Sequence, residues 1–186
     1  MEGIHAPLQG YFGSIPGGLD GVRATLRIMV GIARAFLKPQ VGDAQQTASL
    51  LTVRLTAQSL VQNCPEKDYQ CEASCIQTFV RDRIRYTRDM RTAETLQYPD
   101  KTLSLKSGDC DDKALLFCCL AECIGFDTRF CAIGVNGEEF SHVSGQCLIP
   151  GIGWTNAETI PIDEQGTKVE LGWFPPDCTC LMLAHI

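Results

Sequence analysis

The sequence predicts an α+β fold in which N-terminal helices pack on a small antiparallel sheet. Apolar residues recur at helical spacing between residues 20 and 124, and the period then falls toward two. Turn signals at 136–137 (Asn-Gly) and 150–151 (Pro-Gly) divide this second part, and Asn-Gly is a strong hairpin signal. Helices followed by antiparallel strands are typical of an α+β domain.

Start and stop signals delimit the predicted helices. Asp20 is a candidate N-cap for the first helix, which Pro39 ends, and Pro65 ends the second helix. The last helix is apolar nearly all round, which is typical of a buried helix. The predicted helices cover residues 20–38, 44–62, 68–85 and 110–124.

The predicted strands follow Gly125, which provides a C-terminal cap for the last helix. They cover residues 128–134, 141–148, 153–159 and 181–185. Gly and Pro are frequent in residues 1–20, so we expect an irregular arm there, and residues 87–109 are expected to form a loop. The chain is therefore predicted to consist of an arm, 1–20, and one domain, 21–186.

Length and composition restrict the function. The 186 residues, of which 45% are hydrophobic, suffice for one domain with a substantial core. A net charge of −6 disfavours a nucleic-acid partner, because phosphate binding depends on Lys and Arg. The longest apolar stretch, 26–37, contains two arginines and is too short to span a membrane. The N-terminus lacks the basic and apolar regions of a signal peptide, so secretion by that route is not expected.

Eleven cysteines are present, an odd number, and without a signal peptide a full disulfide framework is not expected. Structural zinc usually takes two pairs of ligands, and the members of each pair are separated by two to four residues. The cysteines that could serve as zinc ligands fit this pattern poorly. We therefore expect no metal and no cofactor. Four cysteines lie in apolar contexts and are expected in the core: Cys118, Cys119, Cys131 and Cys147. The cysteines considered as zinc ligands are Cys64, Cys71 and Cys75, and Cys178 with Cys180.

The segment 108–113, Gly-Asp-Cys-Asp-Asp-Lys, carries most of the chemical information. It places Cys110 at the start of the buried helix, where the positive end of the helix dipole stabilises a thiolate. The neighbouring aspartates raise the pKa of Cys110, so the thiolate depends on pairing with a base. His142, in a predicted strand, is the best placed of three histidines, since His5 and His185 lie near the chain ends.

An imidazole base also needs an orienting group on its other nitrogen. Glu158 and Asn156 lie two residues apart on the next predicted strand and would face the same side. We expect one of them to hold the Nδ1 proton of His142. In the competing interpretation, Cys110 is a capped core thiol and His142 a satisfied polar residue.

Across most of its length the chain resembles the transglutaminase-like cysteine peptidase superfamily, and most closely its short members encoded by tailed bacteriophages and prophages. A Cys in a Gly-Asp-Cys-Asp context, then His-Val, then a Trp-led strand bearing an acid is a specific combination. The resemblance rests on residues 21–29, 81–86 with Asp89, 94–99, 108–113, 125–130, 140–143, 154–159 and 172–176.

The resemblance implies a papain-like core and a role for each site residue. Cys110 matches the nucleophile and His142 the general base. The third member is usually an aspartate, and Glu158 stands at that position, with Asn156 as the second candidate. An oxyanion hole would use the backbone N–H of Cys110, and Gln97 resembles an upstream donor.

The expected activity is acyl transfer on amide bonds, most of all hydrolysis of a peptide or isopeptide bond by a Cys-His-Glu triad. The expected partner is a protein or peptide substrate, with no nucleic acid and no membrane span, in the cytoplasm of a bacterial host. The alternative is a phage virion or assembly protein that uses the same fold without turnover. Its partners would be other phage structural proteins and its location the virion.

Overall fold

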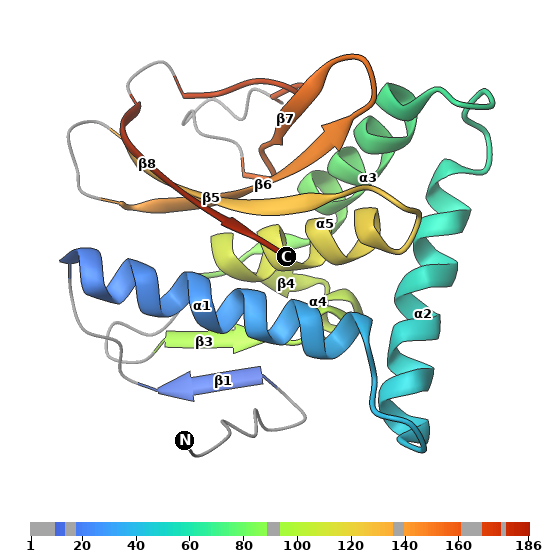
Figure 1. Cartoon of the computed structure of the whole chain (residues 1–186), viewed down its shortest axis with the longest axis horizontal. Helices are drawn as coiled ribbons and strands as arrows, with labels where there is room; N and C mark the ends of the chain where they lie inside the picture. The colour runs from blue at the N-terminus through green and yellow to red at the C-terminus, as the bar shows by residue number, and fades with distance from the viewer. Residues whose placement is uncertain (1–9, 14–17, 89–93, 136–139, 161–168, 176–177) are drawn as a thin grey trace.

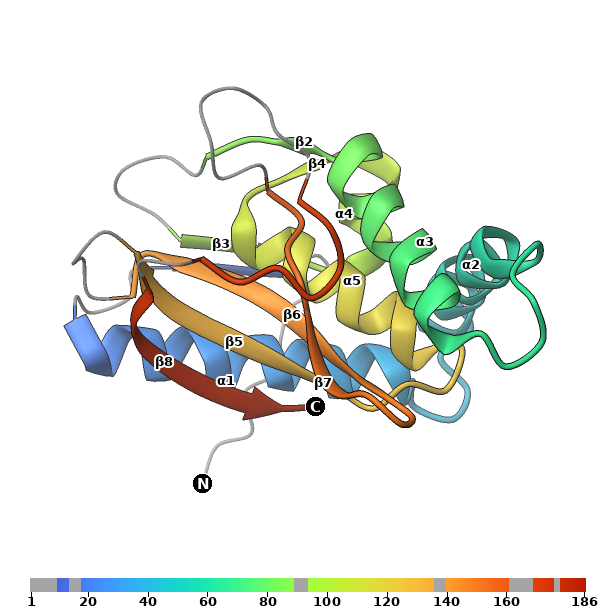
Figure 2. The same ribbon diagram turned by 90° about the horizontal axis from the view of Figure 1, so that it is seen from above.

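A layer of helices covers one face of a four-stranded antiparallel sheet (Figure 1), which confirms the α+β prediction. The computed structural model describes residues 10–13, 18–88, 94–135, 140–160, 169–175 and 178–186. Seen from above, α1 (Gly18–Leu37) and α5 (Cys110–Glu122) run along the sheet, whereas α2 (Ala44–Val61) and α3 (Tyr69–Arg83) lie toward one end (Figure 2).

Aspartate caps begin three of the helices. Asp43, Asp68 and Asp109 each accept a backbone N–H in the first turn, of α2, α3 and α5 respectively. The first helix starts at Gly18, so three residues of the predicted arm, 1–20, belong to α1. Residues 10–13 of that arm form strand β1 (Gly10–Gly13), and the other arm residues lie outside the described part of the chain.

The prediction of a loop over residues 87–109 was wrong. This stretch contains β3 (Glu94–Gln97), the short helix α4 (Pro99–Leu105) and β4 (Ser107–Gly108). Pro99 stands in the first turn of α4, where its fixed φ suits a helix and its missing N–H leaves no bond unmade. The loop prediction overlooked that Pro at such a position also begins helices.

The main sheet has the strand order β7-β6-β5-β8, and all of its pairs are antiparallel. Its members are β5 (Thr128–Val135), β6 (His142–Ile149), β7 (Gly153–Ala157) and β8 (Cys178–His185). These bounds lie within three residues of the predicted strands. Two small pairs complete the described strands: β1 with β3, and β2 (Arg85–Tyr86) with β4.

The core is built around α5, whose residues 111–121 are all buried, as its apolar sequence predicts. Strand β6 approaches this helix closely at Gly145, where an added Cβ would lie 2.6 Å from the Phe117 ring and 3.0 Å from Cys118 Sγ. Glycine is therefore required for the contact between the helix that begins at Cys110 and the strand that begins at His142.

Four of the cysteines belong to the core. Cys118, Cys119, Cys131 and Cys147 are buried, which confirms the expectation for them. A disulfide joins Cys64, in the connection after α2, to Cys71 on α3.

In the described part of the chain, no helix is both long and apolar enough to cross a membrane.

Candidate active site

Cys110 is the first residue of α5, as predicted. The Asp109 side chain caps the helix by accepting the N–H groups of Asp111 and Asp112, at 3.1 and 3.2 Å. Gly108 precedes this cap, and an added Cβ there would lie 2.6 Å from the Asp112 Cβ. The chain therefore enters the helix along a path that suits only glycine, and this path fixes the position of the thiol.

The thiol of Cys110 is held neutral by its surroundings. Its Sγ donates to Asp111 Oδ1 at 3.3 Å. Burial raises the pKa of Cys110 well above its ordinary value, and the charges of Asp111 and Asp109 raise it further, whereas the N–H of Val143 acts in the opposite direction. The expected effect of the aspartates on the pKa of Cys110 is therefore present, and together with burial it outweighs the Val143 N–H.

His142 and Glu158 are joined by a short polar contact. His142 begins β6 and Glu158 follows the last residue of β7. The distance from His142 Nε2 to Glu158 Oε2 is 2.7 Å. The expected contact at Nδ1 was wrong, because the carboxylate contacts Nε2 instead.

The Glu158 side chain is fully buried, and both its second carboxylate oxygen and its backbone carbonyl accept hydrogen bonds. Its Oε1 accepts the N–H of Ile160 at 2.8 Å. Its backbone carbonyl accepts Gln77 Nε2, also at 2.8 Å, and Gln77 bonds the carbonyl of Val169 as well. A carboxylate fixed in this way restricts the imidazole to one orientation.

Lys113 adds a buried cation to the same region. Its Nζ donates to the carbonyls of Ile84 and Arg81, at 2.8 and 3.4 Å. Burial lowers the pKa of Lys113 to about 8, and the negative charge of Glu158 opposes this shift. The sequence pattern alone gave no role to Lys113 or Gln77. The available signal was a charged or amide side chain within an otherwise apolar helix face.

Asn156 lies elsewhere. Its Oδ1 accepts from Ser144 Oγ at 2.7 Å and its Nδ2 donates to the carbonyl of Trp173 at 2.9 Å. The expectation that Asn156 and Glu158 share one face assumed a strand through residue 159, but β7 ends at Ala157. Strand alternation therefore does not extend to Glu158.

Gln97 is bound to the aspartate two residues after Cys110. Its Nε2 donates to Asp112 Oδ2 at 2.7 Å and its backbone N–H to Asp112 Oδ1 at 2.8 Å. The amide nitrogen that would serve as an oxyanion donor is therefore engaged in fixing the first turn of α5.

A cavity of about 310 Å³ brings the thiol and the imidazole together. Cys110 and His142 both line it, with Asp109 and Asp111 beside them. The start of α1 forms another part of the wall, through Gly18, Gly21, Val22, Thr25 and Leu26. A substrate group in this cavity would meet a thiol, an imidazole and the N-terminus of a helix at once.

The sequence of residues 54–159 matches the model of the transglutaminase-like superfamily. This match covers more than half of the chain and includes Cys110, His142 and Glu158. The chain belongs to the transglutaminase-like superfamily.

Solved structures agree with this transglutaminase-like fold. One is a crystal structure of a candidate protease from Parabacteroides distasonis, with a TM-score of 0.54 and 12% identity. Another is a candidate cysteine protease from Cytophaga hutchinsonii, with a TM-score of 0.50 and 16% identity. The alignments cover 80% and 84% of this chain but only 30% and 56% of those longer proteins. At these identities the likeness concerns the fold alone. In sequence, no curated protein matches the chain.

Proposed function

We propose that this transglutaminase-like protein is a thiol-dependent acyl-transfer enzyme that hydrolyses a peptide or isopeptide bond in a protein substrate. Cys110 would be the nucleophile, His142 the general base and Glu158 the group that orients the imidazole. The observation that carries the proposal is the 2.7 Å contact between His142 and buried Glu158, beside a cavity that Cys110 and His142 line together.

The first half of the reaction forms a thioester. His142 Nδ1 takes the proton of Cys110, and the thiolate attacks the carbonyl carbon of the scissile amide. The N-terminus of α5 faces the negative oxygen that develops, which is the position of an oxyanion hole. The imidazolium then gives its proton to the departing amine as the C–N bond breaks.

The second half releases the product. His142 takes a proton from a water molecule, whose oxygen attacks the thioester carbonyl. The C–S bond breaks, the carboxylic acid leaves and Cys110 recovers its proton from His142. Throughout, Glu158 stabilises the imidazolium by accepting a hydrogen bond from its Nε2–H, and the carboxylate itself stays unprotonated.

The resting pKa of Cys110 fits a thiol that ionises by transfer to His142. Burial and two aspartates disfavour a free thiolate, so charge separation depends on the imidazole that receives the proton. Replacement of the family's usual aspartate by Glu158 fits the same scheme, because Ile160 and Gln77 hold the longer residue in place.

The test is alkylation of the native protein with iodoacetamide, mapped by mass spectrometry on every cysteine. We expect Cys110 to react before Cys123, another partly exposed free thiol, and His142→Ala to slow only Cys110. Glu158→Gln should lower turnover of a peptide or isopeptide substrate by roughly 10²–10⁴-fold, because it removes the negative charge beside the imidazolium.

Slow alkylation of Cys110 would contradict the proposal. If Cys110 reacts no faster than Cys123, or reacts only after unfolding, Cys110 is not an activated nucleophile. That result would favour the alternative of a phage structural or assembly protein on the same fold.

A further inference from the structure

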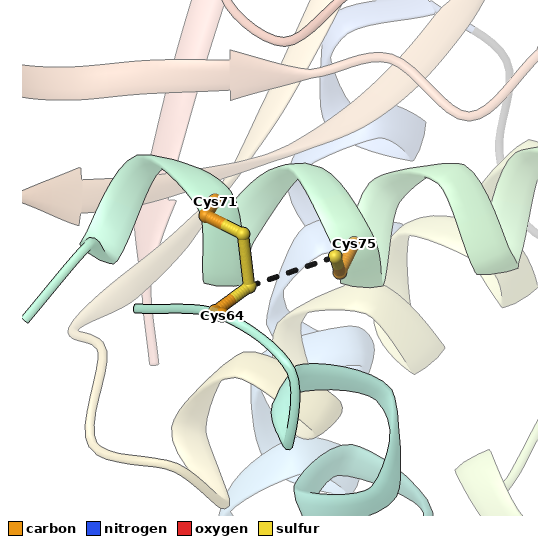
Figure 3. A group of neighbouring side chains, drawn as sticks. All are labelled: Cys64, Cys71 and Cys75. Atoms are coloured by element: carbon orange, nitrogen blue, oxygen red, sulfur yellow. Dashed lines mark hydrogen bonds between the residues drawn. A yellow bond between two sulfur atoms is a disulfide. The ribbon is translucent and has the colours of Figure 1, made fainter. Parts of the chain in front are cut away.

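Three cysteines gather where α2 gives way to α3 (Figure 3). Cys64 lies in the connection and Cys71 and Cys75 on α3, and their sulfur atoms all lie within 4.8 Å of one another. Cys64 is joined to Cys71, and its Sγ lies 3.7 Å from Cys75 Sγ. None of the three lines the cavity at Cys110, so this cluster is separate from the proposed active site.

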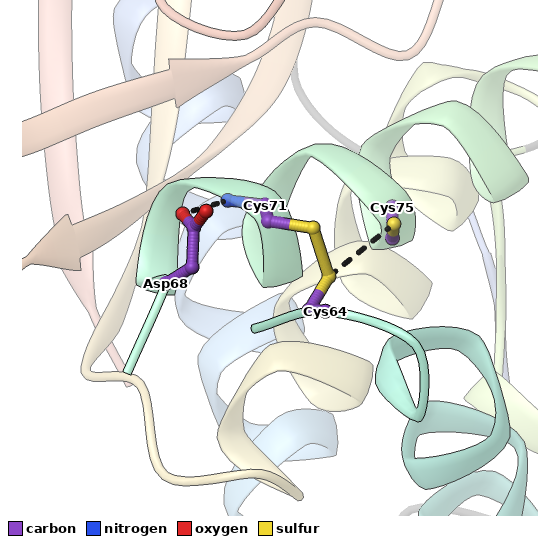
Figure 4. The surroundings of a disulfide bond; sticks show 4 residues. All are labelled: Cys64, Asp68, Cys71 and Cys75. Carbon is purple, nitrogen blue, oxygen red and sulfur yellow. Dashed lines mark hydrogen bonds between the residues drawn. A yellow bond between two sulfur atoms is a disulfide. The ribbon is translucent and has the colours of Figure 1, made fainter. Parts of the chain in front are cut away.

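The local structure holds the three sulfurs together. Cys71 and Cys75 are four residues apart, so they share one face of α3. Asp68 caps this helix and accepts the N–H of Cys71 at 2.9 Å (Figure 4), which places Cys71 in the first turn. A helix N-terminus stabilises a thiolate there. All three residues are half-buried, so solvent species can reach them.

The arrangement of the sulfurs is triangular. In thiol–disulfide exchange the attacking sulfur approaches along the axis of the disulfide. An attack by Cys75 on Cys64 would then place the Cys75 and Cys71 sulfurs about 5.7 Å apart, the sum of 3.7 Å and an ordinary S–S bond. Their separation is at most 4.8 Å. The geometry therefore favours three ligands around one point over a line of exchanging sulfurs.

The length of the metal–sulfur bond fixes the distance between sulfur atoms that bind one metal ion. Sulfurs bound at about 2.3 Å to a tetrahedral zinc ion lie about 3.8 Å apart. The 3.7 Å between Cys64 and Cys75 matches this spacing. Thiolates are soft ligands that select zinc and copper(I) over harder cations.

We propose that the reduced cluster of Cys64, Cys71 and Cys75 binds one thiophilic metal ion, Zn²⁺ or Cu⁺. A dithiol reductant supplies two electrons and two protons to the Cys64–Cys71 disulfide and becomes a disulfide itself. The three thiols then release three protons to solvent as three metal–sulfur bonds form. Water completes the coordination of zinc, whereas copper(I) is satisfied by three thiolates. This proposal departs from the sequence-based expectation of no metal.

The experiment uses the full chain, reduced and then freed of reductant without air. Zn²⁺ and Cu⁺ are titrated separately against a chromophoric chelator, and native mass spectrometry gives the stoichiometry. We expect one metal ion per chain, affinity at least tenfold weaker in Cys75→Ser, and unchanged affinity in the matched control Cys123→Ser. Oxidised protein should lose the capacity to bind, because two of the ligands are then in the disulfide.

A second measurement needs no variant. Bound metal should protect Cys64, Cys71 and Cys75 from alkylation in the wild-type protein while Cys123 continues to react. Failure of both metals to bind at one per chain, or equal affinity in Cys75→Ser, would overturn the proposal. So would disulfide mapping that finds Cys75 exchanged into a disulfide in place of metal protection. None of these outcomes bears on Cys110.

Discussion

The position of Glu158 and the length of its side chain allow its carboxylate to bind two partners. It stands one residue beyond the end of β7, where the chain has left the sheet. Its two carboxylate oxygens serve different partners, His142 on one side and the Ile160 N–H on the other. The extra methylene relative to aspartate therefore spans from the end of the strand to the imidazole without leaving either oxygen unpaired.

Asp111 is the residue whose replacement should make Cys110 more reactive. It accepts the S–H of the neutral thiol, and its negative charge faces the same sulfur. Asp111→Asn removes the charge, so the pKa of Cys110 should fall and its thiolate fraction at neutral pH should rise. We therefore expect faster alkylation of Cys110 at about pH 7, with the pH–rate profile displaced to lower pH.

The control for this change is Asp127→Asn, which removes an equal charge from an exposed position outside the cavity lining. Its pH–rate profile should coincide with that of the wild-type protein. Thermal unfolding of Asp111→Asn would show whether the helix start is retained. An unchanged or slower reaction in a folded Asp111→Asn protein would exclude the electrostatic role.

At the scale of elements, the contact between α5 and β6 sets the relation of Cys110 to His142. Gly145→Ala should force these elements apart, because the new methyl group would lie 2.6 Å from the Phe117 ring. Overpacking of this kind costs about 1–3 kcal/mol. We expect a lower free energy of unfolding in urea and slower alkylation of Cys110, since His142 would move away from the thiol.

The matched control is Gly31→Ala on α1. An added Cβ there meets nothing within 4 Å, and Ala favours a helix over Gly. This variant should be as stable as the wild type or more so, with unchanged alkylation of Cys110. If Gly145→Ala behaved in the same way, the close approach of β6 would not position the site.

The starts of α5 and β6 could be predicted because they depend on residues close by in the sequence. Cys110 at a helix start and His142 at a strand start follow from nearby apolar periodicity and glycine. The bonds of Gln77 and Lys113 link α3, α5 and Glu158 across long separations, and no local pattern encodes them. The choice of Nε2 by Glu158 likewise depends on where β7 ends, which periodicity gives only within a few residues.

At the scale of the whole molecule, α5 connects the chemistry to the core. Its first residue is Cys110, and the residues that follow are buried against the sheet and the other helices. A helix buried on all sides cannot tilt without disturbing the entire core. The thiol of Cys110, the proposed nucleophile, is therefore placed by the folding of the whole domain, so the short motif around it depends on most of this chain for its position.

The buried thiols make the stability of the whole molecule sensitive to alkali. Burial raises the pKa of Cys131 and Cys147 to about 12 and also raises that of Cys118 and Cys119. Above about pH 9 the unfolded chain loses thiol protons that the folded chain keeps, so the free energy of unfolding falls. Each fully ionising thiol contributes ~1.4 kcal/mol per pH unit in that range. Lys113, with its pKa lowered to about 8, acts oppositely up to about 10.5, but this one amine opposes at least five thiols, because the pKa of Cys110 is raised as well.

Urea unfolding with reductant present should therefore give a smaller free energy at about pH 10 than at about pH 8. Cys131→Val retains the approximate side-chain volume and removes one titrating thiol, so its decline over the same interval should be shallower. Lys113→Met should decline more steeply than the wild type, because it removes the opposing amine. Equal free energies at the two pH values in the wild-type protein would mean that the core thiols ionise as readily in the folded chain as in the unfolded one, and thus that water reaches the centre of the domain.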